Sequence, residues 1–163
     1  NALDFWRFDL GLHRFIKTAE NQTIALRTEF GYITSPQAGD SDIFGSEWYR
    51  VGGVTTVRGY DDQYPFAYGT ERVLASVEYR YLFGEFQLAF FVDAGFANNL
   101  RVDLPNNGST IQPGLSPFDL TKYKIGKGVG ISYNMPGIGP LRVDAGINEL
   151  GGVLIQFNIG NSF

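Results

Sequence analysis

The chain has 163 residues, a formal net charge of −4 and no cysteine. This length suits one ordinary domain, and the negative charge excludes a basic nucleic-acid-binding surface. The lack of cysteine excludes disulfides, thiol catalysis and cysteine-based metal sites.

Hydrophobic and polar residues alternate along seven segments, which is the period of a β-strand. The segments are nine to thirteen residues long, longer than an average strand and close to a tilted membrane-spanning strand of about 9 to 11 residues. No run of eighteen apolar residues exists, so no transmembrane helix is predicted. In chain order the predicted strands are Phe5–Lys17, Thr23–Ile33, Arg72–Phe83, Glu85–Ala97, Lys122–Asn134, Pro140–Asn148 and Gly151–Phe163.

Short turns and long connections follow one another between these strands. The long connections are residues 35–71 and 98–121, whereas the other turns, such as Gly84-Glu85, are short. Short turns at one side and long loops at the other are typical of an outer-membrane β-barrel. The last turn, residues 149–152, departs from this layout because it is short where a long loop is due.

The two faces of the predicted strands differ in polarity. One face is almost purely aliphatic and aromatic, and the other carries most of the charge. Burying so many charges in a dry core costs more free energy than their pairing returns. We therefore expect the apolar face to meet the lipid bilayer and the charged face to line a wet lumen, whereas a soluble barrel would have its apolar face inside. The charged residues are Arg7, Asp9, Arg27, Glu29, Glu78, Arg80, Asp93, Arg142 and Asp144.

Four motifs, in order, resemble the BamA superfamily of outer-membrane assembly and translocation barrels. They are GGVTTVRGY at residues 52–60, FVDAG at 91–95, GIGPLRVD at 137–144 and the terminal Phe163. The resemblance covers essentially the whole chain and implies the C-terminal half of a sixteen-stranded barrel. The third motif favours the BamA and TamA branches.

The resemblance implies that the first motif is a lid loop that folds back into the lumen. Its arginine would then pair with acidic residues of the strands that follow. Alternation places Glu78 and Asp93 on the inward face of two strands joined by the Gly84-Glu85 turn, so we expect both to bind this arginine. The lid-loop residues are Val57, Arg58, Gly59 and Tyr60.

The resemblance also implies a function without covalent chemistry. The last strand would form one side of a seam that opens toward client outer-membrane proteins, with assembly-machinery subunits as further partners. The seam residues are Phe157, Ile159, Gly160 and Phe163. We expect the outer membrane of a diderm bacterium as the location, and no catalytic residue, metal or cofactor.

The sequence leaves the assembly of the barrel open. Seven strands are visible, and a loop as long as residues 35–71 does not fit inside an eight-stranded barrel, whose interior side chains already fill. The chain is therefore a piece of a wide barrel, a short barrel with its loop outside, or a short barrel that pairs with a second copy. A self-contained barrel acting as an oligomerising structural or binding module, without insertase activity, is the alternative function.

Overall fold

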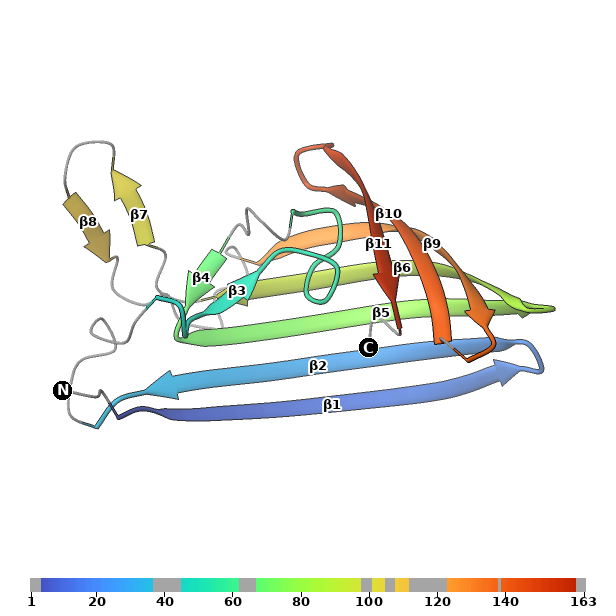
Figure 1. The fold of residues 1–163 in the computed structure, drawn as a ribbon, viewed down its shortest axis with the longest axis horizontal. Helices are drawn as coiled ribbons and strands as arrows, with labels where there is room; N and C mark the ends of the chain where they lie inside the picture. The colour runs from blue at the N-terminus through green and yellow to red at the C-terminus, as the bar shows by residue number, and fades with distance from the viewer. Residues whose placement is uncertain are drawn as a thin grey trace.

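The computed structural model describes residues 4–36, 45–61, 67–97, 101–104, 108–111, 123–137 and 139–160. Regular structure in these residues consists of the strands β1 to β11 (Figure 1). The described segments include no helix that is long and apolar enough to span a membrane.

Seven long strands form one sheet in the order β1-β2-β5-β6-β9-β10-β11. Neighbouring strands are antiparallel throughout. The predicted all-β antiparallel fold is therefore confirmed, with strand ends close to those expected. The bounds are β1 (Trp6–Ala19), β2 (Gln22–Thr34), β5 (Glu71–Phe83), β6 (Phe86–Ala97), β9 (Lys124–Met135), β10 (Gly139–Asn148) and β11 (Val153–Ile159).

Each of the two long connections contains a short antiparallel ribbon. In the first, β3 (Tyr49–Val51) pairs with β4 (Ala67–Gly69). In the second, β7 (Arg101–Leu104) pairs with β8 (Gly108–Ile111). Neither ribbon was expected from alternation, because strands of three or four residues are too short to show a period.

The sheet curls from β1 and β2 toward β9, β10 and β11, and the loop that follows β3 lies on its inner side (Figure 1). Among the described residues, β1 and β11 each have one neighbour in the sheet. Each of these two strands therefore has one free backbone edge, and the side chains of β1 are exposed along its whole length.

The outer face of the sheet exposes large apolar side chains, as the alternation predicts. The inner face carries the buried ionised groups, including Glu78, Asp93, Arg142 and Asp144. At the centre of the inner face a loop covers these charges, whereas alternation alone predicted only a charged face along a wet lumen. The exposed apolar residues of the outer face include Phe8, Leu10, Leu12, Phe30, Val77, Phe90, Val92, Val129, Ile131, Phe157 and Ile159.

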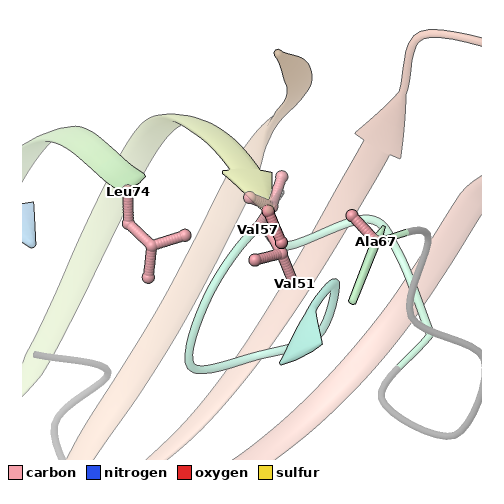
Figure 2. Packing of buried hydrophobic residues seen from close by; sticks show 5 residues of the cluster. Val51, Val57, Ala67 and Leu74 are labelled. Carbon is pink, nitrogen blue, oxygen red and sulfur yellow. The ribbon is translucent and has the colours of Figure 1, made fainter. Parts of the chain in front are cut away.

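The small hydrophobic core lies between the first long connection and the inner face. Val51, Val57 and Ala67 come from the connection and pack with Leu74 of β5 and Ala97 of β6 (Figure 2). A second cluster joins Ile33 of β2 to Trp48 and Tyr49. This core therefore fixes the connection to the sheet.

Candidate functional site

Residues 45–61, here called the lid loop, contact all seven strands of the large sheet. Tyr49 reaches β1, where its hydroxyl donates a 2.8 Å hydrogen bond to a side-chain oxygen of Asp9. At the other end, Gly59 and Tyr60 bond to β11. The contacted residues, one from each strand in sheet order, are Asp9, Arg27, Glu78, Asp93, Gly126, Asn148 and Gln156.

Arg58 is the central anchor of the lid loop, and its side chain is buried. Its Nε and Nη2 donate to the two carboxylate oxygens of Asp93 at 2.7 and 2.8 Å. Its Nη1 donates to Oε2 of Glu78 at 2.6 Å. This two-point geometry matches the planar guanidinium and makes the hydrogen bonds both strong and directional.

An aromatic ring and a hydroxyl complete the surroundings of this anchor. The guanidinium carbon of Arg58 lies 3.5 Å from the centre of the Phe91 ring. Attraction between a cation and the ring face contributes about 0.5–2 kcal/mol, more where water is excluded. Ser76 donates a 2.5 Å hydrogen bond to Asp93 from the neighbouring strand. These contacts hold the planes of both charged groups in place.

Arg142 forms the second half of the same charge cluster. Its Nη1 and Nη2 donate to Glu78 at 2.9 and 2.8 Å, and its Nε donates to Asp144 at 2.8 Å. The Nε of Arg80 also donates to Glu78, at 2.7 Å. Alternation placed Arg142 and Asp144 on the charged face, but it gave no sign that Arg142 shares Glu78 with the lid loop.

The charges of this cluster balance one another. Three arginines, Arg58, Arg80 and Arg142, bind three carboxylates, those of Glu78, Asp93 and Asp144. Burial lowers the pKa of Arg58, but its hydrogen bonds and the charges of Asp93 and Glu78 raise it above its ordinary value. Removing one partner of such a buried network leaves an uncompensated charge and costs about 3–5 kcal/mol.

Two strand glycines allow the lid loop to lie directly on the wall. A Cβ at position 126 would lie 1.8 Å from the carbonyl oxygen of Arg58, and one at 146 would lie 2.4 Å from the nitrogen of Gly59. Gly59 itself has a φ of 92°, a conformation that favours glycine. Gly160 is different, since a Cβ there would meet no atom within 4 Å.

Sequence reasoning missed Gln156 and Asn148, which hold the end of the lid loop. Gln156 accepts a 3.1 Å hydrogen bond from the N–H of Gly59 and donates another of 3.1 Å to the carbonyl of Tyr60. Asn148 donates to the carbonyl of Gly59 at 3.1 Å. The only available signal was the inward position of Gln156 in the alternation of the last strand.

The seam residues that the structure describes, Phe157, Ile159 and Gly160, lie apart from this cluster. Phe157 and Ile159 project from the outer face of β11 and are 72% and 70% exposed. Gly160 follows the strand with a φ of 112°. Phe163 lies outside the described residues. The structure therefore brings Arg58 of the lid loop together with Glu78 and Asp93. It does not bring the described seam residues Phe157, Ile159 and Gly160 to this cluster, and the roles of all four seam residues stay predictions.

Comparison with known proteins assigns the fold to a family. The Omp85 superfamily domain matches residues 1–163. The chain belongs to the Omp85 superfamily. No curated protein matches this Omp85 domain.

A solved structure supports the fold of this Omp85 domain. This Omp85 domain is similar to BamA from Haemophilus ducreyi lacking POTRA domains 1–3, with a TM-score of 0.65 and 19% sequence identity. The alignment covers 94% of this chain and 34% of that chain, so the Omp85 domain spans about a third of the length of this relative. The family match, together with this likeness of fold, confirms the predicted resemblance to the BamA superfamily.

Proposed function

We propose that this Omp85 domain is part of an outer-membrane β-barrel that takes part in the assembly, insertion or translocation of outer-membrane proteins. The observation that carries the proposal is the last strand, β11, which has one free backbone edge among the described residues and lies beside a lid loop anchored by Arg58. A free edge can receive the strand of another chain. The partner would be a client outer-membrane protein or a subunit of the assembly machinery.

The apolar outer face supports a place in the outer membrane of a diderm bacterium, with the lipid bilayer as its partner. Several strands have 12 to 14 residues, enough to cross the hydrocarbon core at the tilt of a barrel strand. Their inner faces hold the buried ionised groups, and their outer faces are mostly apolar, with Lys127 of β9 as an exposed cation among them. This distribution is favourable in lipid and unfavourable in water.

The proposed mechanism is strand addition at β11. A client strand would form backbone hydrogen bonds with the free edge, while Phe157 and Ile159 keep the outer face apolar. The lid loop would set the position of the wall behind this edge through its contacts on β10 and β11. No bond is made or broken covalently in this scheme.

Client folding in proteoliposomes tests the proposal. The intact protein, reconstituted with a client outer-membrane barrel, is compared with R58A, and the folded client is measured by its heat-modifiable gel mobility. We expect R58A to slow client folding strongly, because the lid loop loses its buried anchor. The matched control is R50A, since Arg50 is an exposed arginine of the same loop. Equal client folding in R58A and R50A would contradict the proposal.

A second candidate function is a short barrel that oligomerises as a structural or binding module. The observation that favours it is that β1 has one free backbone edge within the part of the chain that the structure describes and is exposed along its whole length. Two copies joined along β1 would bury this edge. Under this alternative, R58A would leave client folding unchanged and alter the oligomeric state measured in detergent by light scattering.

A further inference from the structure

Strand β11 is held to the sheet by a short ladder. Seven residue pairs, from Leu141–Ile159 to Ile147–Val153, join it to β10, whereas ten join β10 to β9. Among the described residues of β11, only Gln156 is buried. A strand with one neighbour and little side-chain burial is the part of a sheet most prone to local opening.

Gln156 binds the lid loop at two points. Its carbonyl oxygen accepts from the N–H of Gly59, and its amide nitrogen donates to the carbonyl of Tyr60, both at 3.1 Å. The side-chain amide thus pairs with the lid backbone as a neighbouring peptide group would. Both bonds require the segment after Arg58 to lie against Gly146, where there is no side chain to hold it away.

We propose that Gln156 is a latch that couples docking of the lid loop to the pairing of β11 with β10. The argument is thermodynamic: if the two bonds form only when the lid is docked and β11 is paired, each event stabilises the other equally. The docked lid loop therefore keeps β11 paired with β10, and release of Arg58 weakens this pairing. This inference rests on the proposed function, in which β11 is the edge offered to a client.

The size of the coupling follows from the two bonds. Losing two neutral hydrogen bonds corresponds to about a tenfold change in the opening of β11. Leucine at position 156 would fill the same space but leave the Gly59 N–H and the Tyr60 carbonyl without these partners. Glutamate would keep the acceptor and lose the donor.

Hydrogen exchange of the intact protein in detergent, followed by mass spectrometry, measures this opening. The variants are Q156L, Q156E, R58A and the Q156L/R58A double variant. The matched control is N158L, because Asn158 is a polar residue two positions further along the same strand, opposite Arg142. We expect amides 153–159 to exchange about tenfold faster in Q156L and R58A, with Q156E intermediate and N158L at the wild-type rate. The double variant should exchange no faster than R58A.

Three results would overturn the latch. The first is wild-type exchange of β11 in Q156L, and the second is additive acceleration in the double variant, which would mean that Gln156 acts independently of the lid loop. The third is faster exchange in β5 and β6 as well as β11 in both Q156L and Q156E, which would show general support of the sheet. No client is present in this measurement, so failure of the latch is distinguishable from failure of the proposed function, which client folding tests.

Discussion

Arg58 and Asp93 lie 35 positions apart in the chain and are joined by three hydrogen bonds. Two run in parallel from the guanidinium to the carboxylate at 2.7 and 2.8 Å, and the third runs from the Arg58 backbone nitrogen at 3.1 Å. One carboxylate of β6 therefore binds both the side chain and the main chain of the lid loop. This arrangement fixes the loop in position and in orientation.

Lysine at position 58 should not provide the stability that Arg58 provides in this pair. We expect R58K to lower the free energy of unfolding by about 2 kcal/mol, because a lysine ammonium cannot form the two parallel bonds or stack on Phe91. Denaturant unfolding in detergent, followed by the fluorescence of buried Trp48, measures the change, with Trp6 replaced by phenylalanine. R50K is the control and should unfold as the wild type does. Wild-type stability of R58K would show that the two parallel hydrogen bonds from Arg58 to Asp93 do not stabilise the fold.

Arg142 should contribute to the free energy of unfolding at least as much as Arg58, although it lies in the wall and not in the lid loop. We expect R142M to destabilise the protein by about 3–5 kcal/mol, because Asp144 loses its 2.8 Å partner while buried. The same unfolding measurement applies. The control R7M removes an ion pair that is 40% exposed on both sides, and such pairs contribute about 0.2–1 kcal/mol. Similar losses in the two variants would show that the cluster is solvated.

A methyl group at position 126 should displace the lid loop. In G126A the new Cβ would lie 1.8 Å from the carbonyl oxygen of Arg58, so backbone must move. We expect trypsin to cleave after Arg58 at least tenfold faster in G126A than in wild type, because this residue is buried in wild type. A tenfold change corresponds to a decrease of about 1.4 kcal/mol in the free energy of opening the lid loop. G11A is the control, since its Cβ would meet its nearest atoms at 3.8 Å. Wild-type cleavage of G126A would contradict the close contact.

Charge placed on the outer face should have an effect that depends on depth. We expect V129R, in the middle of β9, to lower the free energy of unfolding in lipid vesicles by about 2–4 kcal/mol. I125R, on the same face near the strand end, should lower it by only about 0–1 kcal/mol. Both native side chains are exposed outward. Equal effects at the two depths would argue against a bilayer around this face.

The turn between β10 and β11 should respond to acid. The hydrogen bond from the Ile125 N–H lowers the pKa of Glu149; partial burial opposes this change, and Lys124 adds to it. A depressed pKa means that the stabilisation is complete above the unfolded pKa of about 4.3 and is lost as pH falls through the folded pKa. We expect the Ile125 amide, followed by NMR, to lose its hydrogen bond in that range. E149Q should show no such transition, and a transition in E149Q would assign it to another group.

The local pattern of the sequence determined which side chains face inward. The period of two is a property of each strand alone, so alternation placed Glu78 and Asp93 inside and Phe157 and Ile159 outside. The same period of two puts Gly126 and Gly146 on the inner face, where the structure shows the lid loop in close contact with both. The inward position of the two acidic partners follows from this alternation, whereas the arginine of the lid-loop motif and its pairing with them were implied by the resemblance to the BamA superfamily.

Only the tertiary structure decided which inward residues meet. Gln156 and Asn148 bind Gly59 across 97 and 89 positions, and Arg142 reaches Glu78 across 64. These contacts depend on how far the sheet curls, which accumulates from small twists between neighbouring strands and is not encoded in any one strand. The sequence by itself thus determined the two faces, and the resemblance of its motifs to a family indicated the lid anchor. The curvature of the seven strands decided that the same loop reaches both β1 and β11.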